Sequence, residues 1–149
     1  MKPSQMFSHW KQVRQDLLTT IDKFSQDELT YAPFRGSWPV GQIMLHIPEC
    51  EDFWLHSLVT GQFKPPVEYL LRQYSTKEAI CGVLQATRQR TVALLDRLSE
   101  ADLNQTYRTS HEETFTLAWI IWHVLEHEIH HRGELSLALG LLGREGLDV

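Results

Sequence analysis

The chain has little of what would place a protein outside the cell, in a membrane or on nucleic acid. Its 149 residues include two cysteines, Cys50 and Cys81, too few for a disulfide framework and typical of a reducing compartment. It has no run of five or more basic residues, and its formal net charge of −5 argues against nucleic acid or anionic membrane as a partner. No apolar stretch reaches transmembrane length, and MKPSQMFSHWKQV lacks the apolar core of a signal peptide. We therefore expect a cytoplasmic protein.

Several catalytic motifs are absent as well. The sequence contains no Gly-rich phosphate loop, no Gly-x-Ser-x-Gly and no Cys-x-x-Cys. A metalloprotease is not expected either. Any chemistry must therefore come from other residues, and the eight histidines are the first candidates.

Apolar residues recur at helical spacing in the first half of the chain. The first predicted helix carries a stripe of Phe7, Trp10, Val13, Leu17, Leu18, Ile21 and Phe24. A second helix is predicted from Ser37, as its N-cap, to about Thr60, with Gly61 ending it. Pro48 lies inside this helix, so we expect a kink or a missing hydrogen bond there.

The second half follows a similar plan. Ser75 and Glu78 form a capping box that opens a third helix with Ile80, Leu84, Thr87, Thr91, Leu94, Leu95 and Leu98 on one side. Thr114 is the predicted N-cap of a fourth helix, which ends near Leu139 or Leu142 at Gly140 and Gly143. No segment alternates as a strand does. The expected fold class is all-α.

The two halves resemble each other. SWPVGQIMLHIPECEDFW aligns with TFTLAWIIWHVLEHEIHH, so that His46 pairs with His123 and Cys50 with His127. A Ser-x-x-acid turn, SQDEL in one half and SEADL in the other, precedes each of these segments. The pattern predicts a single domain, residues 1–149, built as a four-helix bundle of two similar helical hairpins. Duplication and chance similarity of two amphipathic helices both remain open.

Four histidines gather within nine residues of the fourth helix. At about 100° per residue, His123, His127, His130, His131 and also Glu134 fall within an arc of about 100° on one helix face. Two imidazoles spaced i, i+4 project the same way and can share one metal ion, but a third ligand must come from another helix. His46 lies in an otherwise apolar segment of the second helix. We predict that it faces these histidines as a ligand.

The chain resembles the DinB/YfiT-like proteins, a bacterial superfamily of damage-inducible metalloproteins. GSWPVGQIMLHIPECEDFW and HVLEHEIHHRGELSLALGLLG are similar to its two signature regions. The resemblance implies a four-helix bundle that holds one divalent metal through His46, His127 and His131, with water in the fourth position. We expect zinc or nickel. The family usually has glutamine after His-Arg-Gly, where this chain has Glu134.

Several roles near the predicted site stay open. His123 is a ligand in place of His131, a hydrogen-bonding neighbour of a ligand, or core filler; the last two are favoured. His130 is expected to face solvent or an interface. Cys50 either joins the metal or is a buried thiol, which we favour. Glu134 orients a ligand imidazole, accepts a proton from metal-bound water, or ends the helix face in solvent.

Two functions are compatible with this sequence. Three histidines and an open position are typical of a catalytic metal site, which lowers the pKa of bound water or of a thiol. The resemblance implies a thiol S-transferase that uses a low-molecular-weight thiol such as bacillithiol or mycothiol on a small electrophilic substrate; hydrolysis is the variant without a thiol. The alternative is a non-catalytic stress-response protein in which the metal stabilises the bundle. Because the fourth helix is apolar almost all round, we also expect a homodimer.

Overall fold

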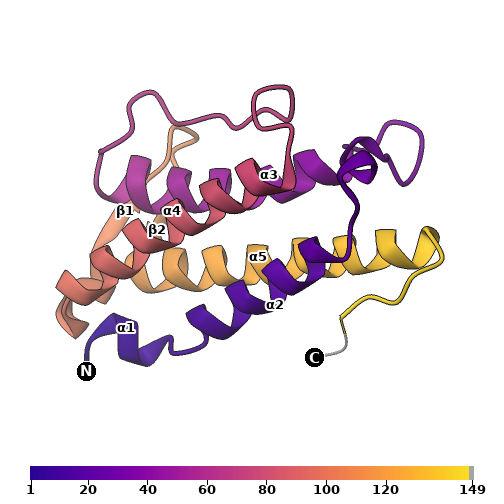
Figure 1. The fold of residues 1–149 in the computed structure, drawn as a ribbon. Helices are drawn as coiled ribbons and strands as arrows, with labels where there is room; N and C mark the ends of the chain where they lie inside the picture. The colour runs from indigo at the N-terminus through magenta and orange to yellow at the C-terminus, as the bar shows by residue number, and fades with distance from the viewer. Residues whose placement is uncertain (148–149) are drawn as a thin grey trace.

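The computed structural model describes residues 1–147, so the last two residues of the predicted domain lie outside the described range. Its α-helices are α1 (Pro3–Met6), α2 (Trp10–Asp22), α3 (Val40–Glu51), α4 (Lys77–Arg97) and α5 (Leu117–Leu141). The helices α2 to α5 form the predicted four-helix bundle, in which α3 packs on both α4 and α5, and α2 packs on α5 (Figure 1). Within the described part of the chain, no helix combines the length and apolar composition that crossing a membrane requires.

The helices begin slightly later than their predicted caps. Thr76, not Ser75, caps α4, and its hydroxyl accepts a hydrogen bond from the Ala79 amide at 3.1 Å. Thr116, not Thr114, caps α5. The predicted cap Ser37 instead bonds the backbone of Phe34, and α3 begins at Val40. Neighbouring Ser and Thr residues have similar capping preferences, so only the backbone conformation selects between them.

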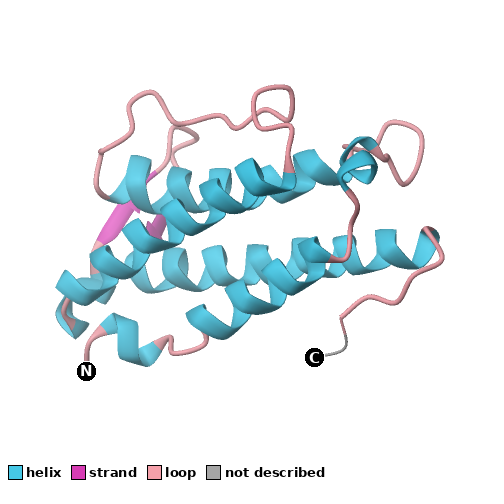
Figure 2. Cartoon of the chain, in the orientation of Figure 1, coloured by secondary structure: helices cyan, strands magenta, loops and turns pink. Residues whose placement is uncertain are grey.

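A short hairpin corrects the expectation of a chain without strands. The strands β1 (Thr106–Arg108) and β2 (Thr114–Thr116) pair antiparallel, with Tyr107 opposite Phe115 (Figure 2). Each strand has only three residues, which is too short for alternation of apolar and polar side chains to be detected in the sequence. The hairpin leads directly into α5 and therefore determines where that helix begins.

The helix that contains Pro48 becomes irregular beyond it. The α-helical hydrogen bonds of α3 continue to Glu51, and the chain then widens into a π-helix, η2 (Asp52–Val59), before Gly61 ends it with a φ of 67°. A proline lacks the N–H that an α-helix needs at its position, so an irregularity was expected here. The change of helix type begins only at Asp52, four residues after Pro48, as a π-helical segment, a feature frequent at functional sites.

The two predicted Ser-x-x-acid turns adopt the same conformation. The segments η1 (Gln26–Thr30) and η3 (Glu100–Asn104) are both 3₁₀-helices that begin with a capping box. The helices α3 and α5 also start at positions that the predicted alignment pairs, Val40 and Leu117. The two halves thus share local structure in the predicted order.

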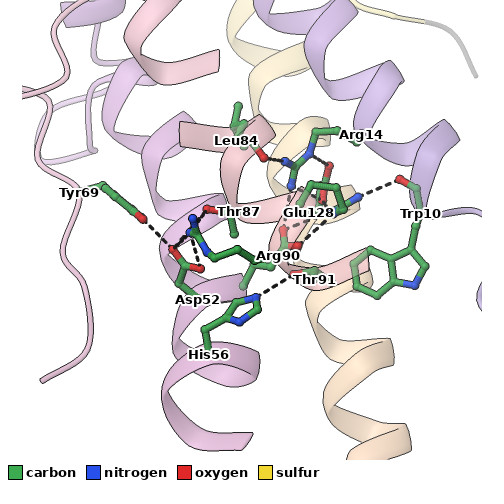
Figure 3. A network of polar contacts seen from close by, with 12 residues as sticks. Trp10, Arg14, Asp52, His56, Tyr69, Leu84, Thr87, Arg90, Thr91 and Glu128 are labelled. Carbon is green, nitrogen blue, oxygen red and sulfur yellow. Dashed lines mark hydrogen bonds and ion pairs between the residues drawn. The ribbon is translucent and has the colours of Figure 1, made fainter. Parts of the chain in front are cut away.

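One charged residue from each main helix meets at the centre of the bundle. Arg14 of α2, Glu51 of α3, Arg88 of α4 and Glu128 of α5 are all less than 10% exposed and separate two apolar core clusters. Arg14 Nε donates to Glu128 at 2.7 Å, and Arg88 Nε donates to Glu51 at 3.0 Å. Figure 3 shows Arg14 and Glu128 directed toward each other from the neighbouring helices α2 and α5. We call these four residues the charged layer.

The charged layer predicts a loss of stability in acid. Burial by itself raises the pKa of Glu51, but the guanidinium groups of Arg88 and Arg14 outweigh it and lower the pKa from 4.5 to about 2. Between these values the unfolded chain binds more protons than the folded chain, so the free energy of unfolding falls as the pH falls from 4.5 to about 2. Urea titrations of the native protein and Glu51→Gln across this window measure the effect. The stability gap between them narrows as the pH falls; parallel curves would contradict this.

Candidate metal centre

Three histidine side chains converge between α3 and α5. His46 lies in α3, and His127 and His131 lie one turn apart in α5. The Nε2 atom of His127 is 3.2 Å from that of His46 and 3.1 Å from that of His131. The structure therefore brings together the three residues predicted as ligands. One ring nitrogen from each of them lies within 4.8 Å of the nitrogens of the other two.

The geometry and protonation of these imidazoles fit a divalent metal ion. Ligand nitrogens about 2.05 Å from a tetrahedral zinc ion are about 3.3 Å apart, close to the observed spacing. Burial, followed by the neighbouring His131 and His46, lowers the pKa of His127 to about 3, and burial also lowers the pKa of His131. Neutral imidazole is the form that binds a metal. Within residues 1–147 no fourth His, Cys, Asp or Glu side chain joins this group.

Carboxylates lie beside the outer nitrogens of two of these rings. Glu134 Oε2 is 2.6 Å from His131 Nδ1 and accepts a hydrogen bond from it when that nitrogen is protonated. Glu49 Oε1 is 3.7 Å from His46 Nδ1. Such carboxylates orient ligand imidazoles and raise their basicity. Sequence reasoning considered Glu134 in this role but missed Glu49, although each follows its histidine by three positions.

The other histidines do not join the cluster. His123 stacks on Trp119 with ring centroids 4.6 Å apart, and it also meets Trp54 edge-on. His130 is exposed, as expected, with Nε2 3.5 Å from Glu134. His56 is buried, and its Nε2 lies at hydrogen-bond distance, 3.2 Å, from the Thr91 hydroxyl. His123 therefore packs as part of an aromatic wall.

Cys50 is a buried thiol near the site. Burial, with a smaller contribution from the charge of Glu51, raises its pKa to about 12, so the thiol stays protonated at neutral pH. Its sulfur does not belong to the cluster of candidate ligands. This arrangement agrees with the favoured interpretation of Cys50 as a small buried side chain.

The segment of α5 around the converging histidines also has the residue spacing of a zinc metalloprotease, but its glutamate is placed differently. His127, Glu128 and His131 have the His-Glu-x-x-His spacing of zinc metalloproteases, which the prediction against that class overlooked. In such enzymes the glutamate is the general base beside the metal. Here Glu128 is 1% exposed and bound to Arg14 and Arg88 in the charged layer. It is therefore unable to take a proton from a ligand at the histidines.

A cavity of about 660 Å³ opens beside the histidines. Its walls come from α3, η2, α5 and the loop segment 65–68, and its lining includes His46, His127, Trp54 and Glu68. The loop is attached to α3 and η2 at Tyr69, whose amide donates to Glu49 at 2.9 Å and whose hydroxyl donates to Asp52 at 2.6 Å (Figure 3). The arrangement can hold a metal ion next to a small molecule.

The sequence model of the DinB family matches residues 1–149. YjoA of Bacillus subtilis is 23% identical over 146 residues, which cover 97% of this chain and 93% of YjoA.

Solved structures show the same fold at low identity. A DinB-like protein from Bacillus cereus aligns with a TM-score of 0.78 and 17% identity, covering 100% of this chain and 99% of its own. The structure of YjoA aligns with a TM-score of 0.76 and 21% identity, covering 97% and 96%. YfiT of Bacillus subtilis, described as a probable metal-dependent hydrolase with an unusual four-helix bundle topology, aligns with a TM-score of 0.59 and 20% identity over 89% and 87%.

Proposed function

Because the chain belongs to the DinB family, we propose that it is a metal-dependent hydrolase of small electrophilic substrates, with zinc or nickel held by His46, His127 and His131. One observation carries the proposal: three imidazole nitrogens converge beside an open cavity, with no fourth protein ligand among residues 1–147. A site with three ligands and one free position is typical of catalytic zinc, whereas structural sites are closed by four. The description of YfiT as a probable metal-dependent hydrolase supports the same reaction class.

The roles of the residues follow from their contacts. When bound, a divalent ion supplies Lewis-acid chemistry, since it polarises a carbonyl group and favours the deprotonated form of water or of a thiol. Glu134 holds the Nδ1 proton of His131 and so directs Nε2 of that ring inward. Glu49 Oε1 lies farther from the corresponding nitrogen of His46, at 3.7 Å, and the other oxygen of this carboxylate accepts from the Tyr69 amide. The aromatic side chains of the cavity exclude water from part of the space where a substrate binds.

Activity measurements test the hydrolase and separate it from the alternatives. We expect the zinc- or nickel-loaded protein to hydrolyse activated esters, and His127→Ala to lose this activity. Turnover that requires an added small thiol would identify thiol transfer in place of hydrolysis. In the cobalt-substituted protein, thiol binding is then visible as a sulfur-to-metal charge-transfer band. A metal that raises the melting temperature without any turnover would replace the enzyme with the structural stress-response function.

Glu134 is expected to act as a positioning residue for His131. Glu134→Ala removes the acceptor from Nδ1 and lowers metal affinity about 10- to 100-fold, the usual effect of losing such a partner. Glu134→Gln keeps an amide oxygen that can accept the same bond, so its metal affinity stays close to that of the native protein. Competition with a chromophoric chelator measures both variants. Equal affinities of Glu134→Ala and the native protein would show that Glu134 is only a solvated helix residue.

We also propose a homodimer formed through the outer face of α5. Several large apolar side chains on this helix are exposed, namely Trp122, Ile129, Leu137 and Leu141. Gly133 and Gly140 lie on the same side, with open space where a Cβ would project, so a second helix can approach closely. Fewer apolar side chains of α5 are exposed than the sequence suggested. The core of the bundle itself buries Leu117, Ile120, Ile121, Val124 and Leu125.

Light scattering at micromolar concentration tests the dimer. The native protein is expected to have twice the mass of the chain, and Leu137→Glu is expected to be monomeric because it places a charge in an apolar contact. Phe34→Glu changes an equally exposed apolar residue outside α5 and is the matched control. A monomeric native protein would contradict the proposal.

A further inference from the structure

The cavity beside the three histidines has an aromatic wall. Phe53, Trp54 and His123 contribute to its lining. Trp119, which lies outside the lining, stacks between Phe115 and His123, with ring centroids 4.1 and 4.6 Å away. Trp54 from η2 meets His123 edge-on at 5.2 Å, and both side chains line the cavity. Burial lowers the pKa of His123, so its ring is neutral at neutral pH. Such a surface suits a flat apolar group and also attracts cations through the ring faces.

The charged residues that line the cavity are all acidic. Glu49 and Glu68 contribute to the lining, and of residues 1–147 no lysine or arginine does. Glu49 is already engaged by His46 and by the Tyr69 amide. Glu68 is exposed and forms no ion pair within the described residues. Its carboxylate is therefore available to a ligand in the cavity.

A bound metal does not cancel the charge of Glu68. A divalent ion brings two positive charges, and the carboxylates of Glu49 and Glu134 lie beside its ligand rings. These two negative charges balance the two positive charges of the ion. The carboxylate of Glu68 is then the uncompensated charge in the lining of the cavity. The position of Glu68 is also restrained, since the next residue, Tyr69, is tied to Glu49 and Asp52.

We infer that the cavity selects substrates that combine a flat apolar group with a cationic group, as in benzylic ammonium compounds, and that Glu68 determines this preference. The inference rests on the proposed function for the reacting group, while the charge preference itself concerns binding. One partly screened carboxylate changes the affinity for a cation by about five- to tenfold. Anionic substrates and thiols with several carboxylates are disfavoured for the same reason.

Three probes that share a benzene ring but differ in charge test the inference. Benzyltrimethylammonium, benzyl alcohol and benzenesulfonate are titrated into the metal-free and the zinc-loaded protein. Binding is followed by the NMR signal of the Trp54 indole, which is assigned by its loss in Trp54→Phe. The ammonium compound is expected to bind about five- to tenfold more tightly than the alcohol, and the sulfonate most weakly.

Variants at Glu68 show whether this residue is responsible. Glu68→Gln is expected to bring the ammonium and alcohol affinities together, and Glu68→Lys to place the sulfonate first. Glu78→Gln, which removes an exposed charge outside the cavity, leaves the preference unchanged. Equal affinities for the three probes, or a preference that survives in Glu68→Gln, would overturn the inference. Because binding is read without turnover, this failure is distinct from a failure to hydrolyse esters.

Discussion

Alanine in place of His127 abolishes stoichiometric binding of zinc or nickel, with an expected loss of affinity above about 100-fold. The reason is the central position of this side chain, whose Nε2 lies 3.2 Å from His46 and 3.1 Å from His131. Without it, the two remaining imidazoles hold an ion only weakly, since stable sites use at least three protein ligands. Native mass spectrometry with metal analysis measures the stoichiometry, and competition with a chelator measures the affinity.

Two further sets of variants define the site. His131→Ala is also expected to abolish stoichiometric binding, and His46→Ala to weaken it strongly, because each removes one of the three converging nitrogens. His9→Ala and His111→Ala change exposed histidines outside the cluster and leave binding intact. Full metal affinity in the His46 variant would show that the ligands do not span α3 and α5 as proposed.

Loss of Glu128 is expected to destabilise the whole bundle. Its carboxylate is 1% exposed and holds Arg14 and Arg88 in the charged layer. Glu128→Ala leaves an excess buried positive charge, which costs about 3–5 kcal/mol. For a chain of this size that corresponds to a fall in melting temperature of about 10–15 °C. Thermal and urea unfolding followed by circular dichroism measure the change.

Control variants separate the charge from the loss of side-chain volume. Glu128→Gln keeps the volume but loses the charge, so it should also be strongly destabilising. Glu126→Ala, on the exposed side of the same helix, is expected to change stability by less than about 0.5 kcal/mol. The double variant Arg14→Met Glu128→Leu removes one charge of each sign, so its cost is smaller than the sum of the single variants. Additive effects would show that the layer is not a coupled unit.

Much of the fold and part of the site follow from local patterns. The periodicity of apolar residues located the four main helices, because each must bury one stripe against its neighbours. The repeated Ser-x-x-acid turns were visible for a similar reason, since a capping box depends only on residues three positions apart. The histidine face of α5 followed from the angle of about 100° per residue in any helix.

The choice among the histidines of α5 needed the neighbouring helix. His123 and His131 are both four positions from His127, so helical spacing treats them alike. The segments α3 and α5 run antiparallel, which places His46 beside His127 and His131 and the later residue Trp54 beside His123 (Figure 1). Among the features of the sequence, only the similarity to a family motif favours His131 over His123 as a metal ligand.

By itself, the sequence determined the helices, their order and the gathering of histidines on one face, because these depend on residues within a few positions of one another. The tertiary structure decided which charges neutralise each other and which groups surround the cavity. Arg14 and Glu128 are 114 positions apart, and Glu51 and Arg88 are 37 apart, so no local spacing could pair them. Glu68 likewise reaches the cavity only because the loop is fastened to η2 through Tyr69 and Asp52. Contacts of this kind depend on how the four helices pack, which no short stretch of sequence specifies.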